Sequence, residues 1–389
     1  MTARKLGIIA STIVVSLVLL ELLALIAIQI REIARPIAPA AHRMLFARDG
    51  IDAHERLKEL TTVYQKQTTL EPYRGFALPK RFQGKFLTTD AYGFRNPPLP
   101  KANPSSVKIG FFGGSTMFGV TSSQSTTISA LVGEALKSEL AQTYDFSIGG
   151  YSTSNELMTF VQVSRLKHYD IKYAVFYDGV NEFSRYIERL QDPVPDPFFE
   201  IIGYPYRTSF RAAANNYLIS TSGPQFQYKP ALVEIWEKLD SRLNRSKNVN
   251  YVLSEDDLDR HVETIYRIYV SNVLDIDTLA RSRNIQAIFI WQPSLLSITG
   301  RNFTESERDI LKSEAIPKKL SDALNARIRN GTELRKVKFY DFSRKFDELS
   351  PGEHFYDYCH VDAEANRLIA SQIVEKLKEF LPADHFQSK

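Results

Sequence analysis

The feature of this chain that most restricts its fold is an alternation of short apolar runs with longer amphipathic segments, which begins at Ser106. Apolar runs of about 4–8 residues are typical of buried strands, and longer segments with apolar side chains three or four positions apart are typical of helices. Strands that alternate with helices form a parallel sheet covered by helices on both faces. The sequence therefore predicts a three-layer α/β/α domain with a mainly parallel sheet.

Each expected element has a range. We expect strands at 107–112, 144–148, 173–177, 285–291 and 336–342, and helices at 125–140, 154–166, 254–282 and 363–380. Prolines and aromatic residues interrupt the alternation at about 183–250, so we expect an insertion over the sheet there, with one helical piece at 231–245. The variable stretch between 291 and 336 receives no predicted element.

The N-terminal segment 6–30 is almost wholly aliphatic. Its polar members are Ser11, Thr12, Ser16, Glu21 and Gln29. A helix needs about 20 apolar residues to cross a bilayer, whereas a cleaved secretory signal has a shorter apolar region of about 7–15 residues and a small-residue cleavage site. The comparable site, Ala38-Pro39-Ala40, lies beyond a charged stretch. We therefore expect a retained transmembrane anchor.

The side of the membrane is set by weaker signals. More arginines follow the anchor than precede it, which by the positive-inside rule favours a cytoplasmic main domain, but long domains translocate largely regardless of charge. We expect a single-pass protein of the cytoplasmic (inner) membrane with its main domain outside the cytoplasm. The predicted plan is a tail at 1–5, the anchor at 6–30, a stalk and lead-in at 31–104, the main domain at 105–382 and a tail at 383–389.

Composition excludes several classes of function. The chain has 389 residues and a formal net charge of only +4, with basic residues spread along it, so no nucleic-acid partner is expected. The single cysteine, Cys359, excludes an internal disulfide and a cysteine-rich zinc site. Neither a phosphate-binding glycine loop nor a histidine–glutamate metal signature occurs in the sequence. We expect no cofactor and no metal.

Polar residues and glycines follow the expected strands at the end where ligands bind in open α/β sheets. Ser115 follows the first strand, Gly149 the second and Asn181 the third, while Asp357 and His360 precede the last helix. Taken singly, each has a plain structural explanation: Ser115 as a helix-capping hydroxyl in a turn, His360 as a capping histidine and Asp357 as a turn residue. Their convergence on one rim favours a shared site.

These residue types suit acyl transfer. Serine becomes a nucleophile when a histidine takes its proton, and an aspartate three positions before that histidine can fix its tautomer. Ser115, His360 and Asp357 are therefore the predicted nucleophile, base and orienting acid. The backbone N–H groups of Ser115 and Gly149 and the side-chain amide of Asn181 are the predicted oxyanion donors.

The pattern resembles the SGNH (GDSL-type) hydrolase superfamily, in its membrane-anchored bacterial Gly-Gly-Ser-Thr branch. The matching blocks are Gly113-Gly114-Ser115-Thr116, Ser147-Ile148-Gly149-Gly150-Tyr151-Ser152, Asp178-Gly179-Val180-Asn181-Glu182 and Asp357-Tyr358-Cys359-His360, with a lead-in at Asp90-Ala91-Tyr92-Gly93-Phe94-Arg95-Asn96. The sequence departs from the commoner family pattern at Gly114, where many members have Asp, at Ser147 in place of Asn, and at Glu182 in place of Asp.

The resemblance implies a flavodoxin-like SGNH fold and a membrane-anchored serine esterase that cleaves O-acyl esters, with an O-acetylated glycan as the substrate suggested by anchored relatives. Two alternatives stay open. One is transfer of the acyl group to a polysaccharide beside a membrane-bound O-acyltransferase, and the other is an inactive SGNH domain that binds a glycan. We assign no catalytic role to Asp178, and we expect Cys359 to be a small packed residue and His354 a solvated loop histidine.

Overall fold

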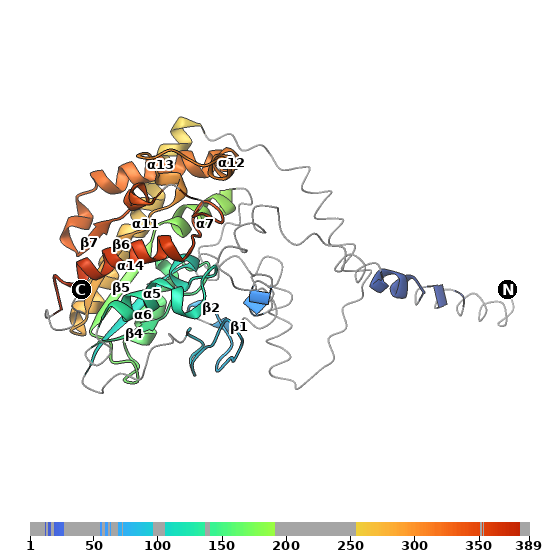
Figure 1. The fold of residues 1–389 in the computed structure, drawn as a ribbon, viewed down its shortest axis with the longest axis horizontal. Coiled ribbons are helices and arrows are strands. Elements are labelled where there is room, and N and C mark those ends of the chain that lie inside the picture. The colour runs from blue at the N-terminus through green and yellow to red at the C-terminus, as the bar shows by residue number, and fades with distance from the viewer. Residues whose placement is uncertain are drawn as a thin grey trace. The chain divides into compact units, whose positions relative to one another are not determined.

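In the computed structural model, the described residues are 12, 15–16, 19–26, 55–56, 59–60, 63, 69–71, 73–95, 106–136, 141–190, 254–350, 352 and 354–381. The chain divides into two compact units, Met1–Ala40 with Ala214–Val252 and Ala41–Ala213 with Leu253–Lys389. The second unit contains the sheet and its helices (Figure 1). The expected stalk, the insertion and the C-terminal tail fall largely outside the described residues, so their boundaries stay predictions.

Five parallel strands form the central sheet, which confirms the predicted mainly parallel α/β fold. They are β3 (Val107–Gly113), β4 (Ala141–Asp145), β5 (Tyr173–Asp178), β6 (Gln286–Trp291) and β7 (Phe339–Asp341), in the order β4-β3-β5-β6-β7. Because all five run in the same direction, the loops after β3, β4 and β5 emerge at one edge. Those loops carry Ser115, Gly149 and Asn181, while Asp357 and His360 lie between β7 and α14 (Ala363–Leu377).

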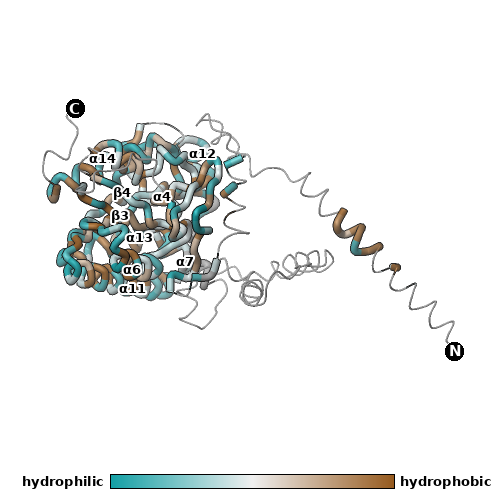
Figure 2. The backbone as a smooth tube through the Cα atoms, turned by 90° about the horizontal axis from the view of Figure 1, so that it is seen from below, coloured by the Kyte–Doolittle hydropathy of each residue, from teal (hydrophilic) through white to brown (hydrophobic). Residues whose placement is uncertain are grey.

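Helices cover both faces of this sheet. The described helices include α4 (Ser115–Phe118), α5 (Ile128–Ala135), α6 (Thr153–Val163), α7 (Val180–Leu190), α11 (Glu255–Ser282), α12 (Glu305–Ser313), α13 (Ala315–Asn330) and α14 (Ala363–Leu377). In Figure 2, α14 lies on one side of β3 and β4, and α6 and α11 lie on the other. The three layers expected from the alternation are therefore present.

Alternation within each strand builds a core on each face of the sheet. Ile109 and Phe111 of β3 belong to the cluster that packs against α5 and α14. The next side chain, Phe112, points to the other face, where it stacks on Phe176 at 4.7 Å between ring centroids, and Phe176 stacks on Phe289 at 5.1 Å. Burial on both faces explains why the strands are apolar throughout.

The lead-in before the sheet packs against the segments that follow β3 and β4. Its residues Phe76, Leu78 and Leu87 form a second buried cluster, which also contains Phe118 of α4 and Tyr151. Arg95, at the end of the lead-in, is buried and donates hydrogen bonds to the carbonyl oxygens of Phe118 and, at 3.0 Å, Gly119. The lead-in thereby fixes the C-terminal end of the short helix that begins at Ser115, a role that its sequence alone did not indicate.

Several parts of the sheet domain differ from the sequence-based expectation. The helix expected at 125–140 is a 3-10 turn (Gln124–Thr126) followed by α5, and α7 continues to Leu190, inside the range expected for the insertion. The second strand, expected at 144–148, is observed at Ala141–Asp145, because these five residues pair with Val107–Phe111 of β3. The stretch left without elements between β6 and β7 contains α12 and α13. A capping box at Thr304 and Glu307 starts α12, and this four-residue pattern was the available signal.

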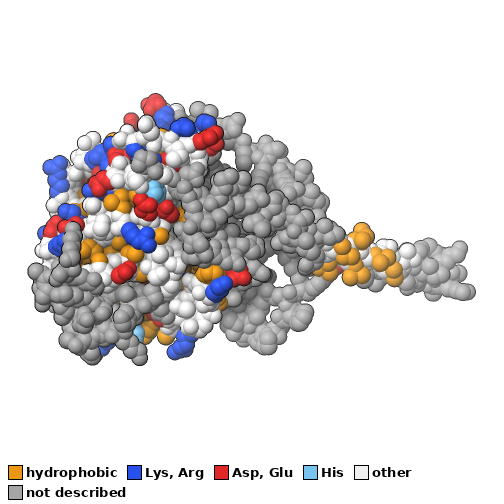
Figure 3. Space-filling model, viewed as in Figure 1, with side chains coloured by type: hydrophobic (Ala, Val, Ile, Leu, Met, Phe, Trp, Pro, Cys, Tyr) orange, Lys and Arg blue, Asp and Glu red, His pale blue; other side chains and the backbone are white. Residues whose placement is uncertain are grey.

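The predicted anchor is described only at residues 12, 15–16 and 19–26, which are helical. Within the described residues, no helix has both the length and the apolar character needed to span a bilayer. The face of the sheet domain seen in Figure 3 carries interspersed acidic and basic side chains in its described part. The described part of that face has no extended region of a single charge, in keeping with the small net charge of the chain.

Candidate active site

Ser115 is the first residue of α4 and follows two glycines in a turn with no room for side chains. A Cβ added at Gly113 would lie 2.7 Å from the Met117 Cβ and 3.0 Å from the Tyr177 carbonyl oxygen. A Cβ added at Gly114 would overlap the amide nitrogen of Asn181. The glycines therefore allow the Ser115 turn to approach the loops that follow the neighbouring strands.

The structure brings Ser115, His360 and Asp357 into one hydrogen-bonded chain. His360 Nε2 lies 2.7 Å from Ser115 Oγ, although the two residues are 245 positions apart in the sequence. On the other side of the ring, His360 Nδ1 lies 2.6 Å from Asp357 Oδ2. These are hydrogen-bonding distances at both ring nitrogens.

The carboxylate of Asp357 determines the direction of the hydrogen bonds that link it to His360 and Ser115. An ionised carboxylate only accepts, so Nδ1 of a neutral His360 carries the proton and donates it to Asp357. Nε2 then has a lone pair that accepts the Ser115 hydroxyl. This is the tautomer in which a histidine can take the proton of a serine.

Electrostatics favour a charged His360 beside a charged Asp357. Burial alone would lower the pKa of His360, but the charge and the hydrogen bond of Asp357 outweigh burial, so that pKa is raised. Burial also favours the neutral form of Asp357, but the charge of His360 and the hydrogen bonds to the carboxylate hold the pKa of Asp357 well below its usual range. An imidazolium formed when Ser115 loses its proton would be stabilised by this carboxylate.

Backbone groups hold Asp357 in place. Its Oδ1 accepts the N–H of Cys359 and the N–H of His360, both at 2.8 Å, while Oδ2 faces the ring. Both carboxylate oxygens are thus occupied by donors from the same short loop. The orientation of His360 follows from the fold of that loop.

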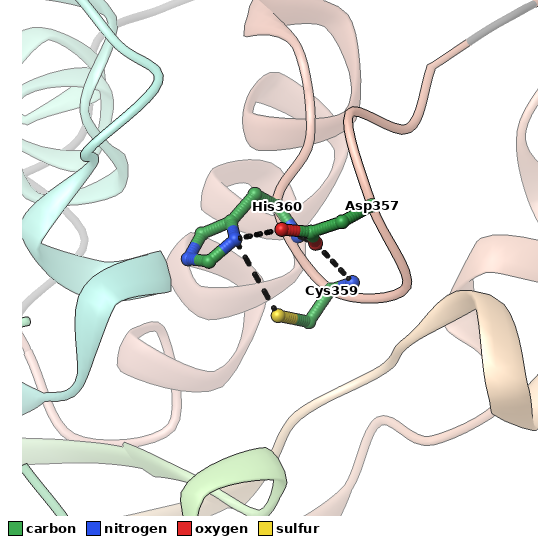
Figure 4. Close-up of side chains that lie close together, drawn as sticks. All are labelled: Asp357, Cys359 and His360. Atoms are coloured by element: carbon green, nitrogen blue, oxygen red, sulfur yellow. Dashed lines mark hydrogen bonds and ion pairs between the residues drawn. The ribbon is translucent and has the colours of Figure 1, made fainter. Parts of the chain in front are cut away.

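Cys359 lies beside this pair without taking part in it. Figure 4 shows the Asp357 carboxylate at the Nδ1 edge of His360, with the sulfur of Cys359 3.6 Å from Nδ1. Donor atoms of Asp357, Cys359 and His360 lie within 4.8 Å of one another, but Nδ1 and Oδ2 already bind each other. Burial and the Asp357 charge raise the pKa of Cys359 well above its usual value, so the sulfur stays a protonated thiol.

The second and third loops lie beside the Ser115 turn. Ile148 donates its N–H to the Gly113 carbonyl at 3.2 Å, and a turn then places Gly149 and Gly150 before Tyr151. Gly150 has φ of 88°, a left-handed conformation that glycine adopts without strain. Gly149 therefore directly follows a residue bonded to the nucleophile turn, while the oxyanion roles of the Gly149 and Ser115 N–H groups stay predictions.

Asn181 projects toward the same turn from the start of α7. Its side-chain nitrogen donates to the Tyr151 carbonyl oxygen at 2.6 Å and lies where a Cβ at Gly114 would be. An amide nitrogen carries two hydrogens, so the bond to Tyr151 orients the group and leaves one N–H for another acceptor. The contacts thus place one predicted oxyanion donor against the nucleophile turn.

Glu182, the residue after Asn181, joins α7 to α6. Its carboxylate accepts the Thr153 N–H at 2.8 Å and the Thr153 hydroxyl at 3.1 Å. Thr153 is the first residue of α6, which follows the glycine turn. The acidic residue at this position therefore ties the Asn181 loop to the Gly149 loop.

Two further polar residues, His354 and Asp178, are buried. His354 is buried, with only 4% of its surface exposed, so the expectation of a solvated loop histidine is wrong. Asp178 is buried as well, and burial together with nearby Glu182 raises its pKa to about 8.

No protein-family model matches the chain, and no curated protein matches it. Solved structures do resemble it. A GDSL-like lipase from Bacteroides thetaiotaomicron is 13% identical, with a match that covers 73% of this chain and 93% of that one at a TM-score of 0.37. A catalytic mutant of an acetylxylan esterase from Geobacillus stearothermophilus is 11% identical, with 73% and 98% covered and a TM-score of 0.37.

Proposed function

We propose that this chain is a serine esterase that cleaves O-acyl esters through an acyl-enzyme on Ser115. The observation that carries the proposal is the chain of two hydrogen bonds, 2.7 Å from Ser115 Oγ to His360 Nε2 and 2.6 Å from His360 Nδ1 to Asp357 Oδ2. The Asn181 amide, placed against the same turn, supports it. A nucleophile, a base, an orienting acid and an oxyanion donor then act at one point.

In the first half of the reaction, Ser115 Oγ bonds to the acyl carbon while its proton passes to His360 Nε2. The carbonyl electrons move onto oxygen, where the Asn181 amide and the predicted backbone donors stabilise the charge. Collapse of this intermediate breaks the bond to the alcohol, which leaves with the proton from His360. In the second half, water repeats these steps, releases the carboxylic acid and restores Ser115.

The setting of this reaction is the second part of the proposal. The aliphatic character of residues 6–30 supports a membrane anchor. We propose that the esterase domain lies outside the cytoplasm, since long domains translocate largely regardless of charge. The acyl group is expected to come from an O-acylated glycan, by the resemblance to anchored SGNH proteins. If a sugar hydroxyl replaces water in the second half, the same residues carry out acyl transfer, and incubation with an acceptor glycan distinguishes the two by whether free acid or acylated glycan forms.

The assignment is tested with an aryl acetate and a serine-directed phosphonate. Ser115→Ala is expected to abolish both turnover and labelling, because the attacking oxygen is missing. Ser125→Ala makes the same chemical change at an exposed position of the neighbouring 3-10 turn (Gln124–Thr126) and is expected to keep both. Turnover that survives in a folded Ser115→Ala protein would refute the proposal.

A further inference from the structure

A second histidine–aspartate pair closes the base of the hairpin that carries Asp357 and His360. The hairpin runs from His354 to Asp362, and an isolated antiparallel bridge joins its two sides. At its base, the Asp362 N–H donates to the His354 carbonyl at 2.9 Å. The two pairs are therefore nested, with Asp357 and His360 inside and His354 and Asp362 outside.

The outer histidine is enclosed and has an acceptor at each ring nitrogen. His354 Nδ1 lies 3.0 Å from Asp362 Oδ2, and Nε2 lies 3.1 Å from the Ser350 carbonyl oxygen. Its side chain is 5% exposed. A Cβ added at Gly352 would lie 2.8 Å from Nε2, so the chain wraps closely around the ring.

These contacts fix the protonation state of His354. A carboxylate and a carbonyl oxygen both accept hydrogen bonds, so both ring nitrogens must donate, and only the imidazolium has two N–H groups. The proton belongs to the ring rather than to Asp362, because Asp362 Oδ1 also accepts the Ala365 N–H at 2.9 Å as the N-cap of α14. A helix N-terminus favours an ionised carboxylate.

We infer that His354 is a positioning residue, held as a buried imidazolium. Its two hydrogen bonds connect the base of the catalytic hairpin to Asp362 at the start of α14 and to the backbone at Ser350. This inference rests on the proposed esterase function. His354 acts through Asp357 and His360, because the base of the hairpin determines where the loop that carries them lies relative to Ser115. The same hairpin is held at its tip by Leu295, whose N–H donates to the Tyr358 carbonyl at 2.9 Å.

The charge of His354 gives the hairpin a pH dependence. The hydrogen bond to Asp362 is the largest cause that raises the pKa of His354, and it outweighs burial, which lowers it. Among the described residues, the charged groups that act on the ring are Asp362 and Glu364, both acidic. The stabilisation is fully present below the ordinary histidine pKa of about 6.5 and is lost as the pH rises through the raised value. Above that pH the neutral ring has one N–H, so one of its two nitrogens faces Asp362 or the Ser350 carbonyl as acceptor against acceptor. We expect the base of the hairpin to become less firmly held.

The test compares pH profiles of kcat on an aryl acetate. In the wild type we expect kcat to fall at acid pH, because His360 must be neutral to act as base. We also expect kcat to decline about ten- to a hundredfold at alkaline pH, as His354 loses its charge and Asp357 and His360 move relative to Ser115. In His354→Asn the amide still donates to Asp362 but does not titrate, so the alkaline decline should vanish while the acid limb stays. His168→Asn, the same change at an exposed histidine, should keep both limbs.

An alkaline decline that persists in His354→Asn, or a wild-type profile without one, would overturn the inference. If His354→Asn does not fold, nitrogen NMR of the full chain labelled at histidine decides, with His360→Asn introduced because His360 also has a raised pKa and could give the same signal. One buried ring with two N–H groups at neutral pH is expected, and neutral tautomers for all six remaining histidines would contradict it. The two proposals fail separately. Without a Ser115 esterase the wild type shows no turnover, whereas the NMR signal of His354 is unaffected.

Discussion

At the scale of single residues, the site depends on a glycine as much as on its polar groups. The Asn181 amide occupies the space where a side chain at Gly114 would begin, and it is aimed by one bond to the Tyr151 carbonyl. In this backbone any side chain at position 114 would move the amide. The absence of a side chain at Gly114 is therefore part of the predicted oxyanion hole.

Gly114→Ala is expected to lower kcat on an aryl acetate by roughly 10²–10³, the usual effect of losing one oxyanion donor. Some loss of stability is also expected, because an added Cβ would lie 3.0 Å from the Tyr151 backbone carbonyl oxygen as well as overlapping the Asn181 amide. Asn181→Ala should cause a similar loss, and the double variant should be hardly slower than either single one. Additive losses in the double variant would show that Gly114 acts by another route.

How far the sequence could predict the site depends on the kind of information each residue carries. Ser115, Asp357 and His360 could be named because chemistry and position along the chain single them out. The pairing of His354 with Asp362 could not, because burial is a property of the folded hairpin and a histidine in a polar loop is usually exposed. The same holds for Arg95, whose partners are carbonyl oxygens and leave no trace in the sequence.

At the scale of elements, α12 supports the catalytic hairpin from a distance. Arg301 and Glu307, at the start of α12, form a two-pronged ion pair with distances of 2.9 and 2.6 Å. Their side chains are 8% and 1% exposed. Helix α12 packs on the 3-10 turn Leu295–Ser297, which in turn holds the hairpin tip through the Leu295 N–H.

Glu307→Ala is expected to lower the free energy of unfolding by about 3–5 kcal/mol, because it leaves the Arg301 charge buried without its carboxylate. Asp309→Ala on the same helix breaks an exposed pair with Lys312, whose side chains are 66% and 75% exposed, and should cost at most about 1 kcal/mol. Denaturant titration of both variants checks the difference. Equal effects would mean that burial of the Arg301–Glu307 pair has no energetic weight.

Helices and strands were predicted correctly where the hydrophobic repeat extends over many residues. They were misplaced where pairing with another strand decides the secondary structure. The helix expected at 254–282 is observed as Glu255–Ser282, with Ser254 as its cap, because 28 residues give a clear repeat. The start of β4 could not be placed, since Ala141 and its neighbours become a strand only by pairing with β3. Short elements depend on contacts that a single sequence does not display.

At the scale of the whole molecule, the sequence predicted a parallel sheet but not the order of its strands. Alternation fixes the class of fold, whereas the order β4-β3-β5-β6-β7 results from the competition of all strands for the central positions. This order sets β3 and β5 side by side, which brings the Ser115 and Asn181 loops together. The convergence of the site is thus a property of the topology.

The proposed anchor makes a prediction for the full chain in a bacterial cell. The protein should sediment with the cytoplasmic membrane and resist extraction at alkaline pH, because an apolar segment of about 20 residues inserts as a helix. In intact spheroplasts, added protease should degrade the main domain if it lies outside the cytoplasm. Release of the full chain into the soluble fraction would refute the anchor, and protection from protease would reverse its orientation.

Ser115 and His360, 245 positions apart in the sequence, are also separated in time during synthesis. At synthesis rates of about 5–20 residues per second, the serine leaves the ribosome on the order of ten seconds or more before its base exists. Throughout that interval the hydroxyl lacks the base that would take its proton, so it is not an activated nucleophile. Reactivity begins only when the C-terminal hairpin docks. The time at which phosphonate labelling of Ser115 begins therefore measures when the last step of folding occurs.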